Sequence, residues 1–191
     1  MADEKNIRAF LATDPPEEIL REIAGVQGSL KRSLRGDIRW VRPEGIHLTL
    51  KFFGDISEAD VRAIFDIVER QVASVAPMSF QLGELGAFPD YQHPRVIWVG
   101  LMGDISPLEE LQKRLDQQFQ TIGFPGEDRP FRAHLTLGRV KTAKGPIGLA
   151  QSVGAIRTTG RFKIGDLSLF RSQLSPQGAS YTKLATFVFR G

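Results

Sequence analysis

The sequence predicts an α+β fold built mainly from antiparallel strands. Strand and helix patterns alternate along the chain, yet several consecutive strands are joined by short turns, which only antiparallel neighbours allow. The tetrapeptide His-Leu-Thr-Leu occurs twice, at residues 47–50 and 134–137, a little under half the chain apart. Because each copy follows turn residues and lies downstream of a predicted helix, we interpret the chain as a duplicated α+β unit.

Local signals order the first half of the chain. Asp14 or Thr13 is expected to cap a helix that has proline in its first turn and apolar residues at helical spacing from Ile19 to Leu34. Ser57 is expected to cap a second helix, with Asp60 completing a capping box. The apolar face of this second helix comprises Val61, Ile64, Phe65, Val68 and Val72. The other predicted elements are the strands Asn6–Ala12 and Asp37–Val41, the turn Arg42–Gly45, and the strand Ile46–Phe53 closed by Gly54.

The second half repeats this alternation. Ser106 is expected to cap a helix in a box with Glu109, with Pro107 at the first helical position. The apolar face of this helix comprises Leu108, Leu111, Leu115 and Phe119, and a glycine- and proline-rich break follows at residues 123–126. The predicted elements around it are the strands Met78–Leu85, Arg95–Leu101 and Phe131–Val140, a weak helix around Ile147–Val153, and a hairpin of Gly160–Gln173 and Tyr181–Arg190 across Ser175–Gly178.

Composition restricts the class of protein. The 191 residues are 41% hydrophobic and 25% charged, as in a soluble globular domain. The chain has no cysteine, which excludes disulfides, thiolate catalysis and cysteine-rich zinc sites. Its N-terminus is polar and no apolar run approaches the ~20 residues that span a bilayer, so we expect a cytoplasmic protein. A net charge of +3 favours a polyanionic partner without demonstrating one.

The repeated motif predicts acid–base chemistry at phosphorus. Strand alternation puts the histidine and threonine of each copy on one face and the leucines on the other. Histidine titrates near neutral pH, so one neutral imidazole, of His47 or His134, can take a proton while the other, charged, gives one. The hydroxyls of Thr49 and Thr136 can bind phosphate oxygens, and nearby arginines can stabilise developing charge.

Other interpretations of these residues remain open. Each motif could be only the solvated face of a half-buried strand. The two histidines could bind zinc, although no third ligand stands at a recognisable spacing and we expect no metal. His93 lies in a proline-rich loop, where a surface position is favoured over a place at the lip of a cleft. Trp98 is expected in the core, and Trp40 and Phe53 are expected either in the core or stacked on a base.

The motifs and their flanks resemble the 2H phosphoesterase superfamily. Within it they resemble the bacterial and archaeal RNA 2′,3′-cyclic phosphodiesterases, also called the 2′-5′ RNA ligase family. The segments Arg39–Gly54 and Phe131–Lys141 are similar to the two signatures of this family, Pro94–Gly100 to its middle segment, and the stretch from Phe170 to Tyr181 to its C-terminal hairpin. The chain departs from the pattern at Ala133, where the family often has proline before the second histidine.

The resemblance implies a single domain over residues 1–191 made of two packed lobes. The fold is then bilobal and pseudo-symmetric, each lobe an antiparallel sheet flanked by helices, with the active cleft between the lobes. The implied reaction is metal-independent hydrolysis of an RNA 2′,3′-cyclic phosphate to a 2′-phosphomonoester, without a cofactor. His47 is then the general acid that protonates the 3′ oxygen, and His134 is the general base that activates water. Thr49 and Thr136 bind the phosphate and Arg139 supports it.

The residues alone leave the roles of the two histidines interchangeable. They also leave two other functions open. One is ATP-independent joining of a cyclic phosphate to a 5′-hydroxyl, and the other is a nucleotide- or RNA-binding module without turnover. We expect the partner to be an RNA end or a nucleotide with a 2′,3′-cyclic phosphate, with no membrane association, and the protein to be a monomer.

Overall fold

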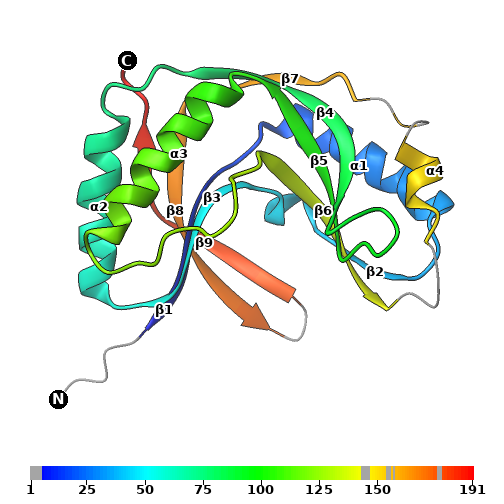
Figure 1. The fold of residues 1–191 in the computed structure, drawn as a ribbon, viewed down its shortest axis with the longest axis horizontal. Helices are drawn as coiled ribbons and strands as arrows, with labels where there is room; N and C mark the ends of the chain where they lie inside the picture. Colours follow the sequence, from blue (N-terminus) through cyan, green and yellow to red (C-terminus); the bar gives the residue numbers. More distant parts are fainter. Residues whose placement is uncertain (1–5, 143–146, 154–155, 157, 176–177) are drawn as a thin grey trace.

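Nine strands form one antiparallel sheet in the computed structural model, which describes residues 6–142, 147–153, 156, 158–175 and 178–191 (Figure 1). Eight of the strands follow the order β7-β4-β5-β6-β3-β1-β8-β9, and β2 pairs with β6. The strands are β1 (Ile7–Thr13), β2 (Asp37–Trp40), β3 (Leu48–Ile56), β4 (Met78–Phe88), β5 (Val96–Gly103), β6 (His134–Thr142), β7 (Arg161–Ile164), β8 (Asp166–Ser175) and β9 (Gly178–Val188). The predicted α+β class is confirmed.

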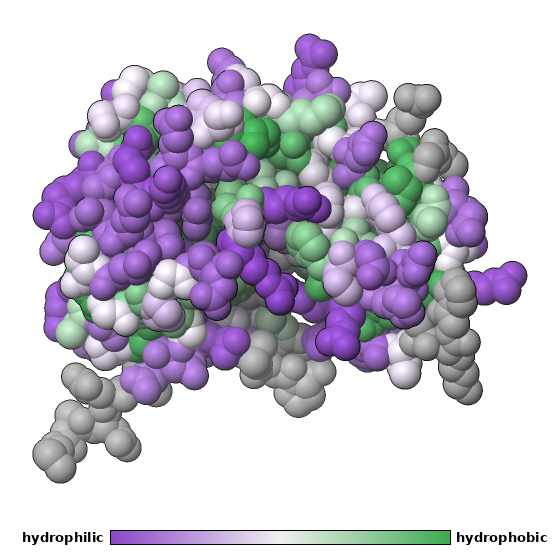
Figure 2. Space-filling model, in the orientation of Figure 1, coloured by the Kyte–Doolittle hydropathy of each residue, from purple (hydrophilic) through white to green (hydrophobic). Residues whose placement is uncertain are grey.

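Helices cover the two halves of the sheet separately. The helices are α1 (Glu17–Ser33), α2 (Glu58–Val72), α3 (Ile105–Gln120) and α4 (Leu149–Val153), and a short 3₁₀ turn spans Pro43–Gly45. Figure 1 shows α2 and α3 side by side over one half, and α1 with α4 over the other. Hydrophilic residues cover the outer surface of the α2–α3 half (Figure 2), so the apolar faces of these helices turn inward. No helix among the described residues is long and apolar enough to span a membrane.

The predicted apolar faces form much of the core. Leu108, Leu111, Leu115 and Phe119 of α3 are all buried, as the spacing predicted. On α2 the buried residues are Ile64, Ile67, Val68 and Val72, whereas Phe65 is 40% exposed. The expectation of a buried Phe65 is therefore wrong, and its ring instead lies at the margin of the core, 5.0 Å from that of Phe187.

Helix starts were predicted correctly in one case of three. The capping box of α2 is present: the Asp60 amide donates to Ser57 Oγ and the Ser57 amide donates to the Asp60 carboxylate. The box expected at Ser106 is wrong because α3 begins earlier, after Asp104, whose carboxylate instead accepts a hydrogen bond from the Ser79 amide. The cap expected for α1 is also wrong, since Pro16 occupies that position.

Several strand boundaries also differ from the expectation, two of them with consequences for the fold. β3 does not end before Gly54 but continues to Ile56, because Gly54 adopts φ +77° and β1 still pairs with β3 across the bulge there. The single strand expected over Gly160–Gln173 is divided at Gly165 into β7 and β8. β7 pairs with β4 and β8 pairs with β1, so this segment crosses from one half of the sheet to the other. The centre of the predicted turn after β8, residues 176–177, lies outside the described residues.

Candidate active site

The two motifs meet where the halves of the sheet join. β3 and β6 pair antiparallel, with Leu48 opposite Leu135. Extending this register by one residue on each side puts His47 opposite Thr136 and Thr49 opposite His134. Both leucines are buried, which contributes roughly 1.5–3 kcal/mol each to folding. The two histidines and two threonines therefore share the opposite face, with the imidazoles diagonal to each other.

His47 is held by a carboxylate that sequence analysis assigned to a helix cap. Its Nδ1 lies 2.7 Å from Asp14 Oδ1, and Asp14 Oδ2 lies 2.7 Å from Lys183 Nζ on β9. Burial favours a higher pKa for Asp14, but the hydrogen bonds from His47 and Lys183 outweigh it and lower the pKa of that carboxyl. Asp14 is thus an anion that accepts hydrogen bonds, so His47 carries its proton on Nδ1 and directs Nε2 elsewhere.

Aromatic rings enclose the rest of the His47 side chain, which is only 7% exposed. The ring of Phe170 lies 4.8 Å from the imidazole, that of Tyr181 5.0 Å and that of Phe10 5.5 Å. Within the described residues His47 Nε2 is buried and has no hydrogen-bond partner. A buried polar atom without a partner costs stability, so a substrate group that hydrogen-bonds to this nitrogen would remove that cost.

The charged groups near His134 are positive, whereas the carboxylate beside His47 is negative. Its Nδ1 donates to the Arg132 carbonyl oxygen at 2.7 Å, so this ring also keeps its proton on Nδ1 and leaves Nε2 available. Burial lowers the pKa of His134, and the positive charges of Arg139 and Arg132 lower it further, against an opposing effect of the hydrogen bond to Arg132. His134 is therefore held neutral at neutral pH, beside cations, whereas His47 lies beside an anion.

Trp98 belongs to the site and not to the core, so the expectation of a core tryptophan is wrong. It pairs with Thr136 across β5 and β6, and its ring lies 6.0 Å from that of His134. Phe88 contacts both rings, with its ring centre 5.1 Å from each. Alternation along β5 turns Ile97 into the core and Trp98 to the opposite face. An apolar sequence context could not indicate which of the two faced inward.

Gly86 packs directly against the ring of Trp98, because it has no Cβ that would overlap the ring. A Cβ at Gly86 would lie 2.2 Å from two atoms of the Trp98 ring. We expect Gly86→Ala to displace the indole from the His134 side of the site. Because small misplacements in active sites slow reactions, kcat/KM for the reaction at this site should fall by about tenfold. Steady-state kinetics measures this. The matched control is Gly25→Ala, on α1, where a Cβ meets nothing within 4 Å and activity should not change.

A bulge in β6 brings Arg139 to the face of the histidines. β5 pairs Trp98 with Thr136 but Ile97 with Gly138, so Leu137 is an extra residue on β6. Such a bulge shifts the alternation of side chains by one residue. Arg139, opposite Val96, therefore lies on the same face as Thr136. The sequence placed Arg139 near the site, but regular alternation would have put it on the opposite face.

Other candidates from the sequence lie away from the histidines. His93 is a surface residue whose side chain is 82% exposed, 3.8 Å from Asp90. Phe53 packs on Phe119 and Phe124 in the core, so it does not form a stacking surface for a base. Lys51 flanks the first motif in sequence but is buried on the core side, where its Nζ lies 2.7 Å from Asp116 Oδ1.

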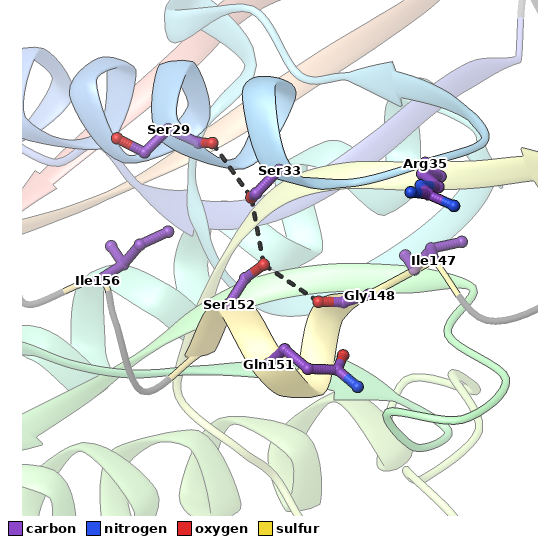
Figure 3. Close-up of a pocket in the computed structure, with 8 residues that line it drawn as sticks. All are labelled: Ser29, Ser33, Arg35, Ile147, Gly148, Gln151, Ser152 and Ile156. Carbon is purple, nitrogen blue, oxygen red and sulfur yellow. Dashed lines mark hydrogen bonds between the residues drawn. The ribbon is translucent and has the colours of Figure 1, made fainter.

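Trp40 also packs against the core. A pocket among the described residues also lies away from the histidines (Figure 3). It has a volume of about 700 Å³ and lies between the C-terminal end of α1 and α4, where Ser33, Ser152 and the Gly148 carbonyl are linked by hydrogen bonds. Neither motif histidine lines it.

Within the described residues no group of three His, Asp or Glu side chains could hold a metal ion, so the zinc alternative gains no third ligand.

Comparison with known proteins supports the duplication. The sequence model of the LigT-like phosphoesterase family matches residues 14–98 and again residues 99–181. Each match contains one copy of the motif and one of the two histidines. The segment that holds Asp14 begins the first match, and the segment that holds Tyr181 ends the second.

Similar proteins extend over the whole chain. An RNA 2′,3′-cyclic phosphodiesterase of Methanothermobacter thermautotrophicus is 35% identical and covers 95% of this chain and 98% of its own length. One of Methanocaldococcus jannaschii is 33% identical, covering 92% and 96%. A crystal structure of a Thermus thermophilus protein matches with a TM-score of 0.82 at 27% identity, covering 97% of this chain and 99% of its own. With these matches and two copies of the family model, the chain belongs to the LigT-like phosphoesterase family.

Proposed function

We propose that this protein hydrolyses 2′,3′-cyclic phosphates at RNA ends to 2′-phosphomonoesters, using His134 as general base and His47 as general acid. The relatives named above as RNA 2′,3′-cyclic phosphodiesterases support the reaction. One observation carries the assignment of roles: two imidazoles with the same tautomer lie on one face, but one is beside a carboxylate and the other beside arginines.

His134 suits the base because it is held neutral. Its Nε2 has a free lone pair, and the lowered pKa keeps that lone pair available at neutral pH. In the proposed step it removes a proton from water as the water oxygen forms a bond to phosphorus. His134 then carries the positive charge, and exchange with solvent returns it to the neutral state.

His47 suits the acid because Asp14 stabilises the imidazolium form through a charge-assisted hydrogen bond at 2.7 Å. As the bond from phosphorus to the 3′ oxygen breaks, His47 Nε2 donates its proton to that oxygen. The product is a 3′-hydroxyl with the phosphate left on the 2′ oxygen. The diagonal placement of the two imidazoles suits attack and departure on opposite sides of the phosphate.

Three further residues supply the phosphate site. The hydroxyls of Thr49 and Thr136 share the face of the histidines and donate to the non-bridging oxygens. Arg139 adds positive charge on the same face, which stabilises the negative charge that grows on the phosphate in the transition state. One chain provides all of these groups, and we propose that the protein acts as a monomer.

Turnover of a defined RNA tests this proposal. An oligonucleotide ending in a 2′,3′-cyclic phosphate should be converted to the 2′-phosphomonoester at an unchanged rate in excess EDTA, because both proton transfers use side chains. ³¹P NMR identifies the product. A 3′-phosphate product, or loss of activity in EDTA, would exclude this mechanism. Adding an RNA with a 5′-hydroxyl to the same reaction measures 2′-5′ joining as a second product.

A further inference from the structure

Two arginines face each other beside the site. Arg39 on β2 is directly opposite Arg139 on β6, and both are exposed. Directly opposed residues of antiparallel strands lie on the same face, with Cβ atoms about 4.5–5.5 Å apart. On either side of this pair, Ile38 and Trp40 turn to the core that α1 covers. The two arginines therefore point the other way, to the face of His134 and Thr136.

Arg39 and Arg139 place two positive charges directly opposite each other, and such a pair lowers the stability of a sheet. Among the described residues neither guanidinium forms an ion pair within 4.0 Å. The nearest acidic residue along β2, Asp37, lies 3.9 Å from Lys141 instead. An anion bound between the two guanidinium groups would remove the repulsion and satisfy their planar donors.

The position of the pair relative to Thr136, which we propose binds the reacting phosphate, indicates which anion it would bind. Arg139 is opposite Val96, two residues along β5 from Trp98, which is opposite Thr136. Two residues of strand span about 6.6 Å. This backbone separation is of the same order as the spacing between neighbouring phosphates of one nucleic-acid strand. It is short enough for the charge of Arg139 to lower the pKa of His134.

We propose that Arg39 binds the phosphate on the 5′ oxygen of the terminal nucleoside, the first internal phosphodiester of an RNA chain, and that Arg139 lies between this phosphate and the reacting one. This inference rests on the proposed function, and it makes Arg39 a residue that selects RNA ends over cyclic mononucleotides that lack a 5′-phosphate. The planar guanidinium of Arg39 forms charge-assisted hydrogen bonds to this phosphate, so the contact should lower KM and leave kcat unchanged.

Three substrates that differ in one group test the proposal. They are a nucleoside 2′,3′-cyclic phosphate with a free 5′-hydroxyl, the same compound with a 5′-phosphate, and a dinucleotide with an internal phosphodiester and the same cyclic end. We expect the unmodified protein to prefer the second and third over the first by about tenfold in kcat/KM. Arg39→Gln should abolish both preferences, through KM, and leave turnover of the first substrate unchanged.

Controls separate this effect from misfolding. Arg62→Gln replaces another exposed arginine, on α2, and should keep both preferences. Arg39→Gln should melt at no lower temperature than the unmodified protein, because it removes a repulsion. The salt dependence of log KM for the dinucleotide should also weaken by about 0.7 in slope, the value for one phosphate contact on a single strand.

The results that would overturn the role of Arg39 differ from those that would overturn the proposed function. If Arg39→Gln lowers kcat/KM equally for all three substrates, or keeps both preferences, the proposal is overturned. A preference for the 5′-phosphorylated mononucleotide without one for the dinucleotide would overturn the assignment to an RNA chain. Failure of the unmodified protein to turn over any of the three substrates would instead overturn the proposed function.

Discussion

Replacing either motif histidine with alanine is expected to lower kcat for a 2′,3′-cyclic phosphate by ~10²–10⁴-fold, the usual contribution of a positioned acid or base. His134→Ala removes the Nε2 lone pair that the lowered pKa keeps available. His47→Ala removes the proton donor held by Asp14. Because both groups act in one transition state, the double variant should be little worse than either single one.

The chain offers a matched control in its third histidine. His93→Ala changes an exposed loop side chain and should leave kcat and KM unchanged. Circular dichroism and thermal melting of all variants establish that the fold is kept. If either motif variant retained more than about a tenth of the activity, its histidine would not be performing the proton transfer assigned to it.

Asp14→Asn is expected to lower kcat by about 10–100-fold, the usual effect of losing a group that orients a functional histidine. The amide cannot form the charge-assisted hydrogen bond that the carboxylate makes to His47 Nδ1, so the loss should appear in kcat with KM unchanged. An amide in this position can also orient the ring with its NH₂ group, which disturbs the tautomer. Asp14→Glu, which keeps a carboxylate, should retain more of kcat than Asp14→Asn, whereas a merely structural role would not favour the carboxylate.

Asp90→Asn provides the control for this prediction. Asp90 also lies close to a histidine, His93, but both are exposed and lie in the loop between β4 and β5. Its replacement should change neither kcat nor KM. An Asp14→Asn variant with the kcat of the unmodified protein would contradict the role of Asp14 beside the acid.

The parts of the fold that depend on local patterns could be predicted. The capping box of α2 and the apolar face of α3 need only residues three or four apart, and both are present. The His-Leu-Thr-Leu alternation depends on neighbouring residues, and Leu48 and Leu135 are buried as it requires. The motif alone therefore indicates where the two halves of the sheet join.

The features that depend on pairing between distant segments could not be predicted from the sequence. Asp14 follows β1 and precedes two prolines, which is a typical setting for a helix cap, and nothing nearby indicates that His47 and Lys183 lie within hydrogen-bonding distance. The bulge at Leu137 is set by the register with β5, so the face of Arg139 could not be derived from its own strand. The passage from β7 to β8 likewise depends on which partner strand lies beside each segment.

The pH dependence of kcat/KM for a 2′,3′-cyclic phosphate tests the division of labour between the histidines most directly. We predict a bell-shaped profile, since His134 must be neutral and His47 charged. Because the pKa of His134 is lowered, the acid limb should lie below about 6.5, the ordinary value for histidine. A rate that is constant across this range, or that rises with pH without an alkaline limb, would contradict the assignment of one base and one acid.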